Sequence, residues 1–296
     1  MSSKKVSMSI DDNPYRLSDE DLENRESHMA PGLLKNQVVL VSGGGSGIGR
    51  STAWLAARLG AHVIVAGKTM EKLDAVCKPL TDLGFKCDAI SVNIRDRQSV
   101  DDLFSKIRSE FGRLDILINS AGGQFPQAAI DFSEGGWNAV VDTNLTGTFH
   151  MMQAAARLWK DLNASGSIVN LVTVNRGLHG VSHSVAARAG VIAFSECVAV
   201  EWAPLNIRVN CVAPGTIQTE GWVTYSEEAR QTYPKTNPMM KVSNPWNIAH
   251  SCLFVGGPMG EFMTGETLVV DGGGRHWGQI WTTGRPDYFS IDDEDA

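Results

Sequence analysis

Residues 38–50 read VVLVSGGGSGIGR, a short apolar run that passes directly into a glycine cluster. The apolar run is typical of a buried β-strand, and the spacing of apolar residues from Arg50 to Leu59 predicts a helix. Glycines at such a junction allow a tight reversal and let the backbone approach an anion that the N-terminal amides of the helix attract. The spacing of Gly43, Gly47 and Gly49 therefore predicts a loop that holds the pyrophosphate of a dinucleotide, together with Ser46 and Ile48.

The end of the second strand bears on which dinucleotide binds. A carboxylate there would hold the ribose 2'-hydroxyl of NAD, but this strand ends Ala66-Gly67-Lys68. With Arg50 expected nearby, Lys68 favours a 2'-phosphate, so we expect NADP(H), with NAD(H) as the alternative. Lys68 could instead be a solvated charge at the start of a helix.

Six more β-branched or apolar runs follow the first strand, and several are separated by stretches with helical spacing. The runs lie at residues 63–65, 89–92, 116–118, 167–169, 207–209 and 267–270. Alternating strands and helices imply right-handed crossovers and helices on both faces of a parallel sheet. We therefore predict the α/β class, a Rossmann-type doubly wound parallel sheet of about seven strands in a single domain.

The boundaries of this domain are expected at residues 31–275. Residues 1–30 are polar and lack periodicity, which predicts a flexible N-terminal arm, and residues 276–296 form a C-terminal extension with an acidic end. Residues 221–245 are rich in aromatic residues, proline and methionine in an irregular context. We interpret them as a substrate-loop insertion, with a packed helical excursion as the alternative.

Composition narrows the class of partner. The 296 residues carry a formal charge of −7 without a run of Lys or Arg, which argues against nucleic acid and favours a small-molecule substrate. The five cysteines are scattered and include no C-x-x-C pair, so we expect neither disulfides nor a metal site, and a reducing, cytoplasmic compartment. The first thirty residues lack the features of a secretory signal, and we see no apolar run of membrane-spanning length.

Three further segments carry a resemblance to short-chain dehydrogenases/reductases. They are Asn119-Ser120-Ala121-Gly122, Asn144 within DTNLTG, and Pro214-Gly215, and the resemblance covers residues 33–274. It implies that Asn144 is the active-site asparagine, and that the final VDGG lies near a subunit contact of a homotetramer. It also implies further cofactor contacts, which would be at Asn93, Ile94, Asn119, Ala121, Gly122, Pro214, Gly215, Thr216 and Ile217.

The catalytic motif departs from this family. Where the family has Tyr-x-x-x-Lys, this chain has Ser184 and Arg188, and a serine hydroxyl is a much poorer acid than a phenol. Arg188 could still bind the nicotinamide ribose, and His183 could exchange protons or act only as a spacer. Thr173 is nearest to the position of the family's catalytic serine. The tyrosines at 225 and 233 lie far along the chain, so we expect no tyrosine near Ser184.

Within the family, three blocks resemble peroxisomal trans-2-enoyl-CoA reductases and, more distantly, 2,4-dienoyl-CoA reductases: residues 122–125, 136–149 and 183–190. Bacterial citronellol/citronellal dehydrogenases are also similar. Enoyl reduction adds hydride to the β-carbon and a proton to the α-carbon, and donors near the thioester oxygen stabilise the enolate, so a strong phenolic acid is less necessary. We expect an enoyl-CoA reductase-like enzyme; the alternatives are an alcohol/aldehyde dehydrogenase of the citronellol type and a cofactor-binding pseudoenzyme.

Overall fold

The computed structural model describes residues 13–174, 178–278, 281–283, 286 and 289. Its centre is a sheet of seven strands in the order β3-β2-β1-β4-β5-β6-β7, and all neighbouring pairs are parallel. The strands are β1 Val38–Ser42, β2 His62–Gly67, β3 Lys86–Ser91, β4 Ile116–Asn119, β5 Gly166–Leu171, β6 Ile207–Pro214 and β7 Thr267–Val270. The predicted fold class and all seven predicted strands are confirmed.

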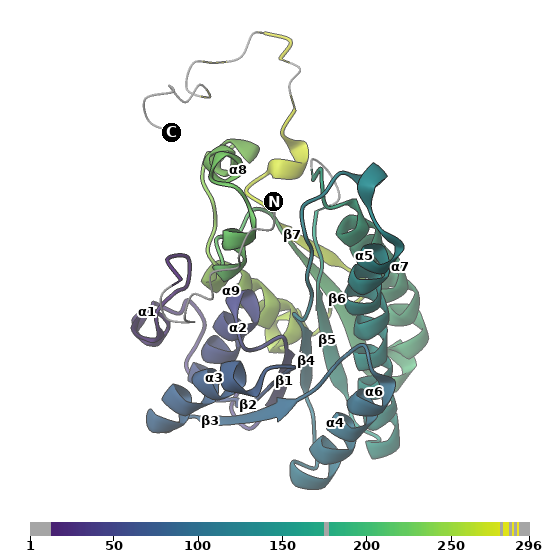
Figure 1. Ribbon diagram of the computed structural model, residues 1–296. Coiled ribbons are helices and arrows are strands. Elements are labelled where there is room, and N and C mark those ends of the chain that lie inside the picture. The colour runs from purple at the N-terminus through teal and green to yellow at the C-terminus, as the bar shows by residue number, and fades with distance from the viewer. Residues whose placement is uncertain (1–12, 175–177, 279–280, 284–285, 287–288, 290–296) are drawn as a thin grey trace.

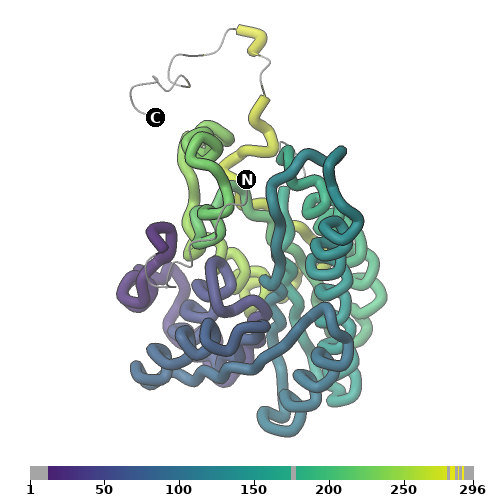
Figure 2. The backbone as a smooth tube through the Cα atoms, in the orientation of Figure 1, coloured from purple at the N-terminus to yellow at the C-terminus, as the bar shows by residue number. Residues whose placement is uncertain are grey.

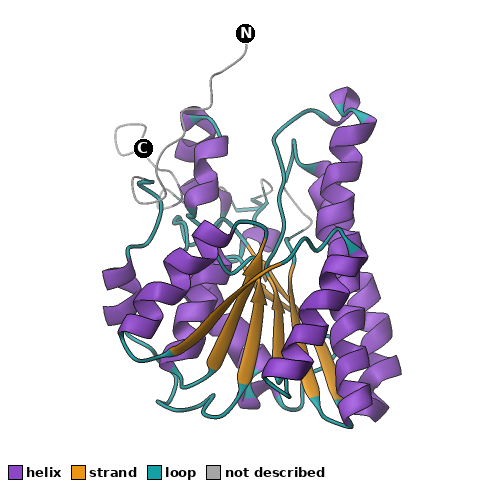
Figure 3. Ribbon diagram, turned by 60° about the horizontal axis from the view of Figure 1, so that its bottom comes forward, coloured by secondary structure: helices purple, strands orange, loops and turns teal. Residues whose placement is uncertain are grey.

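Helices cover both faces of this sheet, as Figures 1 and 3 show. Parallel neighbouring strands need a crossover connection between them, and the helices that follow the strands form these connections. The α-helices are α1 Asp19–Asn24, α2 Gly47–Arg58, α3 Met70–Asp82, α4 Arg97–Glu110, α5 Glu134–Val141, α6 Gly147–Leu162, α7 Ser182–Trp202, α8 Glu227–Thr232 and α9 Pro245–Gly256.

The first strand shows how the sequence produces the two layers. Alternate side chains of a strand point to opposite faces of the sheet. Val39 and Val41 join one core, together with residues of α2 and α9, whereas Val38 and Leu40 join the other, together with residues of α4 and α6. All five residues of β1 are buried, which is why its sequence is apolar without alternation.

The strand order makes the carboxyl end of β1 a topological switch point, and we call the region at this end of the strands the crevice. This strand pairs with β2 on one side and with β4 on the other, so the chain changes direction across the sheet there. In open α/β sheets such a switch point leaves room for a ligand at the carboxyl ends of the strands. The glycine cluster after β1 lies at this point.

The segment expected to be an arm is described from Asn13 onward, and there it packs on the domain (Figure 2). Ser18 caps α1 through a capping box, and the side chain of Leu22 is fully buried in the core. Arg58 of α2 donates hydrogen bonds to the carbonyl oxygens of Leu22 and Arg25, at 2.8 and 2.7 Å. Residues 13–26 are thus attached to α2, whereas residues 1–12 lie outside the described part.

Residues 221–245 form a short helical excursion. It contains the end of a 3-10 helix, Glu220–Thr224, then α8 and a second 3-10 helix, Tyr233–Thr236. Its base is closed where Gln218 N donates to Ser243 O (2.9 Å) and Ser243 N donates to Thr216 O (3.0 Å). Of the C-terminal extension, the described residues begin with a 3-10 turn, Gly274–His276, and most of the remainder lies outside the described part.

The segment Ser182–Leu205, which includes α7, is the one described helical segment long and apolar enough to cross a membrane, with a mean hydropathy of 1.2. Our expectation that no run reaches this length is therefore wrong. Its apolar character has a local explanation, since α7 packs against β6 and buries Val191 and Val198. A core helix of a doubly wound sheet passes the same test of length and hydropathy.

Candidate active site

The loop after β1 is held in a conformation that requires glycine. Gly43 has a φ of +70°, and its N–H donates to Ala66 O at 2.7 Å. A Cβ at this position would lie 2.6 Å from the backbone nitrogen of Ala121, in the loop after β4. The loop after β1 and the loop after β4 therefore approach each other so closely that no side chain fits on Gly43.

The N-terminus of α2 faces the crevice, as the glycine spacing predicts. Ser46 precedes the helix without capping it through its side chain, and the first-turn amides of a helix have no acceptor within the helix. The N–H of Gly47 donates instead to the Glu220 carboxylate, at 2.9 Å from Oε2. A carboxylate oxygen here stands in for a phosphate oxygen, so these residues fit the pyrophosphate of a dinucleotide.

The two cations expected near the adenosine ribose have different surroundings. Lys68 follows β2 and is exposed at the carboxyl edge of the sheet. Arg50 is only 2% exposed; it donates to Leu17 O at 2.7 Å and pairs with Asp19. The expectation that Arg50 supports a 2'-phosphate is therefore wrong, because its guanidinium binds the N-terminal segment.

The two residues expected to border the adenine ring of the cofactor lie on the loop between β3 and α4. Asn93 shapes the turn into α4: its Oδ1 accepts from Arg95 N at 3.3 Å, and its N–H donates to Ser99 Oγ at 3.0 Å. Ile94 is buried, and a Cβ on Gly147 would lie 2.7 Å from its Cγ1. Asn93 and Ile94 therefore lie on the loop that the sequence predicted for them, and Asn93 also stabilises the turn into α4.

Asn119 belongs to a buried polar chain across the strand ends. Its Nδ2 donates to Asn170 Oδ1 at 2.8 Å, and Asn170 Nδ2 donates to Ser195 Oγ of α7 at 2.9 Å. Buried amides need such partners, since an unpaired one costs about 1–3 kcal/mol. The network ties β4, β5 and α7 together at the point where the chain runs from Asn119 into Ala121 and Gly122.

Three segments meet around Asn144, which lies in a π-helical turn, Asp142–Thr146, between α5 and α6. Its Oδ1 accepts from Gly123 N and its Nδ2 donates to Gly123 O, both at 2.9 Å. The same Nδ2 lies 3.2 Å from Ser184 Oγ, which accepts its second hydrogen. Asn144 and Ser184 are 2% and 0% exposed, so this pair lies beneath the surface of the crevice. The structure brings the predicted asparagine and the predicted serine into contact.

Arg188 lies one turn of α7 beyond Ser184. Its Nη1 donates to Leu171 O at the end of β5, and a Cβ on Gly122 would clash with its Nη2. Burial lowers the pKa of Arg188 to about 10, and no carboxylate of the described residues offsets this loss of hydration. The guanidinium remains charged at neutral pH, so the corner between Gly122 and β5 carries a positive charge.

His183 and Thr173 do not join this cluster through any hydrogen bond among the described residues. The ring of His183 is fully buried and stacks on Phe132 at 4.4 Å between centroids, with Phe125 edge-on at 4.5 Å. Neither of its ring nitrogens has a hydrogen-bond partner in the described part of the chain. Aromatic packing favours a spacer role for His183. Thr173 is half-buried just after β5, next to residues 175–177, which are not described.

The segment after β6 forms the last part of the carboxyl edge of the sheet. A Cβ on Gly215 would lie 2.7 Å from Asp271 Cα, so the chain can leave β6 at this angle only without a side chain. Pro214 ends β6, and Ile217 pairs with Ser243 at the base of the helical excursion. Thr216 shares a hydrogen bond with Thr236, at 3.1 Å between the two hydroxyl oxygens. The four predicted positions are contiguous and border the crevice.

Sequence reasoning missed one residue at this edge. Gln124 Nε2 donates to the hydroxyl of Tyr225 at 2.7 Å, although the two residues are 101 positions apart. Gln124 adjoins Gly123, which is bonded to Asn144. Tyr225 therefore bridges the loop after β4 and the excursion after β6. Nothing in the local sequence marks this contact.

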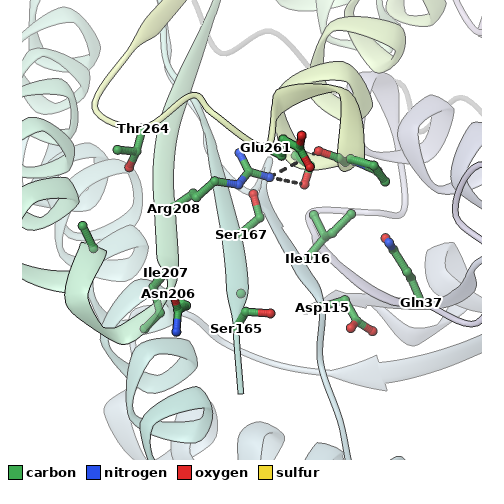
Figure 4. Close-up of a pocket in the computed structure, with 15 residues that line it drawn as sticks. Gln37, Asp115, Ile116, Ser165, Ser167, Asn206, Ile207, Arg208, Glu261 and Thr264 are labelled. Carbon is green, nitrogen blue, oxygen red and sulfur yellow. Dashed lines mark hydrogen bonds between the residues drawn. The ribbon is translucent and has the colours of Figure 1, made fainter. Parts of the chain in front are cut away.

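A cavity of about 400 Å³ lies at the opposite, amino edge of β4 to β6 (Figure 4). Arg208 lines this cavity, and the Nη2 atom of Arg208 donates to the carbonyl oxygens of Gly256 and Gly257, at 2.9 and 3.3 Å. Those carbonyls belong to the C-terminal end of α9, where a cation is favourable. Arg208 thus caps a helix, and the cavity is separate from the crevice.

Comparisons with known proteins agree with this geometry. Residues 43–275 match a family model described as enoyl-(acyl carrier protein) reductase. A probable 2,4-dienoyl-CoA reductase of Bacillus subtilis is 33% identical over 247 residues, which cover 81% of this chain and 97% of the relative. A peroxisomal 2,4-dienoyl-CoA reductase of Pongo abelii is 34% identical over 252 residues, or 82% and 85% of the two chains. Among solved structures, a citronellol catabolism dehydrogenase of Pseudomonas aeruginosa superimposes with a TM-score of 0.75 and 35% identity, covering 84% of this chain and 99% of its own.

Proposed function

Because the chain belongs to the short-chain dehydrogenase/reductase family, we propose that it is an NADP(H)-dependent reductase of α,β-unsaturated acyl thioesters or related terpenoids. One observation carries the proposal. Helix α7 carries Ser184, bonded to Asn144, and the half-buried cation Arg188, in place of a phenol and a lysine. This corner is better suited to stabilising negative charge on a substrate than to donating a proton from a strong acid.

Each group has a defined part in this mechanism. When bound, the nicotinamide supplies the hydride that adds to the β-carbon of the substrate. Arg188, whose guanidinium lies next to Gly122, would bind the nicotinamide ribose. Asn144 holds Gly123 in place, and Ser184 Oγ, which accepts from Asn144 beneath the surface, fixes the orientation of the Asn144 amide. Thr173 follows β5 at the same edge of the sheet and would face the substrate there, and water or another weak acid would protonate the α-carbon.

The proposed cofactor contacts are those of the crevice described above. The backbone amides at the start of α2 would hold the pyrophosphate, and Lys68 would hold the 2'-phosphate. The loop containing Asn93 and Ile94 would border the adenine, and the segment from Pro214 to Ile217 the nicotinamide. The glycines support this assignment, because a Cβ on Gly43 or Gly49 would meet backbone atoms of Ala121 or Gly43, so the close turn into α2 forms only without side chains there.

The preference for NADP(H) rests on Lys68 alone, since Arg50 is committed elsewhere. Lys68→Asp should weaken NADP(H) binding by about 10- to 150-fold, the equivalent of one charge-assisted hydrogen bond of about 1.5–3 kcal/mol, and should weaken NAD(H) binding much less. Fluorescence titration with both cofactors measures this. Lys160→Asp, at an exposed position on α6, is the charge-matched control. Stronger binding of NAD(H) than of NADP(H) by the wild type contradicts this assignment of Lys68.

The reaction itself is tested by following nicotinamide absorbance with a panel of trans-2-enoyl-CoA and 2,4-dienoyl-CoA esters, citronellal and citronellol. We expect oxidation of NADPH by the enoyl or dienoyl esters. Turnover of citronellol alone would support the second candidate, an alcohol/aldehyde dehydrogenase, which the likeness to the Pseudomonas aeruginosa structure favours. Tight cofactor binding without turnover of any of these compounds would indicate a pseudoenzyme.

The same proposal includes a cytoplasmic homotetramer. Five free cysteines agree with a reducing compartment. Several large apolar side chains are exposed on α7 and near the C-terminal end of α9, among them Val200 at 77% and Phe262 at 103%. Exposed apolar surface of this kind is typical of protein interfaces. Light scattering of the purified protein measures the oligomeric state.

A further inference from the structure

The carboxylate of Glu220 occupies the part of the crevice that an anionic ligand needs. Gly47 N lies 2.9 Å from Glu220 Oε2, although the two residues are 173 positions apart. Gly47 has a φ of +52° and no side chain, so its N–H is open to an acceptor from outside the helix. The first-turn amides and the positive end of the helix dipole attract any anion placed there. In this structure that anion is a side chain of the protein itself.

The N-terminal segment holds Glu220 in this position. Arg16 Nε lies 4.0 Å from Glu220 Oε1, and Asn13 Nδ2 donates to the backbone oxygen of Glu220 at 3.2 Å. The side chains of Arg16 and Glu220 are only 9% and 19% exposed. Water and salt therefore screen their attraction less than that of a surface pair.

That segment is itself fixed by hydrogen bonds and packing contacts other than those with Glu220. Arg50 of α2 donates to Leu17 O and pairs with Asp19, and Trp246 of α9 donates to Glu26 O at 3.0 Å. The ring of Tyr15 packs on Trp222, two residues after Glu220, with 5.6 Å between centroids. Glu220 is thus held from both sides, by the helix that its carboxylate caps and by the segment that packs beside it.

A carboxylate and a pyrophosphate cannot occupy the same amides at the same time. We propose that Glu220 is an intramolecular competitor of the cofactor's pyrophosphate, and that its carboxylate must leave Gly47 N before a dinucleotide binds. This inference rests on the dinucleotide site of the proposed function. Binding then includes the cost of separating Glu220 from Gly47 and from Arg16. The wild-type affinity is lower by that amount, and residues 13–16 become part of the cofactor site although they lie outside the glycine loop.

The test compares Glu220→Gln with Glu228→Gln. Glutamine at 220 keeps the shape of the side chain but removes the charge, so it competes more weakly for the amides. Glu228 lies on α8 in the same excursion and is exposed, and its substitution changes the net charge equally. The ligands are ADP-ribose, which contains the pyrophosphate, and adenosine, which does not. Calorimetric titration at constant salt gives each dissociation constant, and circular dichroism checks folding.

We expect Glu220→Gln to bind ADP-ribose about 3- to 10-fold more tightly than the wild type, a factor typical of one hydrogen bond or helix-dipole interaction. Its affinity for adenosine should not change, and Glu228→Gln should match the wild type with both ligands. Equal or weaker binding of ADP-ribose by Glu220→Gln overturns the inference, as does equal tightening towards both ligands or an equal effect of Glu228→Gln. If the wild type and both variants bind no ADP-ribose, the dinucleotide site of the proposed function fails and the inference fails with it.

Discussion

The loop between β1 and α2 and the first turns of α7 border the same crevice, but they are built from different kinds of atoms. In the loop, backbone groups form the candidate binding site, and Gly43 and Gly47 both have positive φ angles. The α7 corner works through side chains, where Asn144 joins Gly123 and Ser184 across 21 and 40 positions of sequence. A backbone site depends on the absence of side chains, so almost any substitution damages it. A side-chain site can exchange one group for another and keep its shape, which is how Ser184 and Arg188 can stand at the positions where the family resemblance led us to expect Tyr and Lys.

Gly43→Ala should give the largest effect and sharpen this contrast. The new Cβ would lie 2.6 Å from Ala121 N in a backbone conformation unfavourable to L-residues. We expect about 2–5 kcal/mol of lost stability, from strain and overpacking together, and loss of measurable cofactor binding. Urea unfolding and cofactor titration measure the two losses.

Gly84→Ala is the matched control for this substitution. Gly84 has a φ of +86°, but a Cβ there meets nothing within 4 Å. It should cost only the conformational strain of about 1–2 kcal/mol and leave cofactor binding intact. Equal losses in the two variants would mean that the close approach to Ala121 is unimportant.

Arg188→Ala should have the next largest effect, on binding more than on folding. Removing this half-buried cation next to Gly122 should weaken cofactor binding by about 10- to 150-fold, which corresponds to about 1.5–3 kcal/mol for a charge-assisted hydrogen bond. Arg157→Ala, at an exposed position on α6, is the control. Unchanged affinity and rate in Arg188→Ala would remove Arg188 from the cofactor site.

Ser184→Ala should have the smallest effect. Loss of a principal acid costs about 10²- to 10⁴-fold in rate, whereas Ser184 contributes one auxiliary hydrogen bond, worth about tenfold or less. Single-turnover kinetics with the best substrate of the panel measures it. If turnover disappears while folding and cofactor binding persist, Ser184 is a primary catalytic group and the mechanism proposed above is wrong. Aldehyde reduction gained by combining Ser184→Tyr with Arg188→Lys would indicate that the usual catalytic pair has been lost from this corner.

Local sequence determined the architecture of this protein. The run from Val38 to Val41 identifies a strand buried on both faces, and the glycines that follow identify the turn into α2, because period, length and φ preference act over a few residues. The same reasoning located all seven strands, whereas the segments that carry Asn144, Ser184 and Arg188 were located by their resemblance to a known family. These segments meet because the carboxyl ends of parallel strands share one edge of the sheet.

The groups that pair across the carboxyl edge of the sheet are known only from the tertiary structure. Arg50 lies one residue after the glycine motif, yet it binds Leu17 and Asp19 of the N-terminal segment. Tyr225 meets Gln124, and Glu220 meets Gly47, from 101 and 173 positions away. Such contacts depend on how the excursion after β6 and the segment before β1 fold back over the crevice. Periodicity and spacing describe neighbours along the chain, so they contain no information about pairs that only the packing of distant segments brings within hydrogen-bond distance.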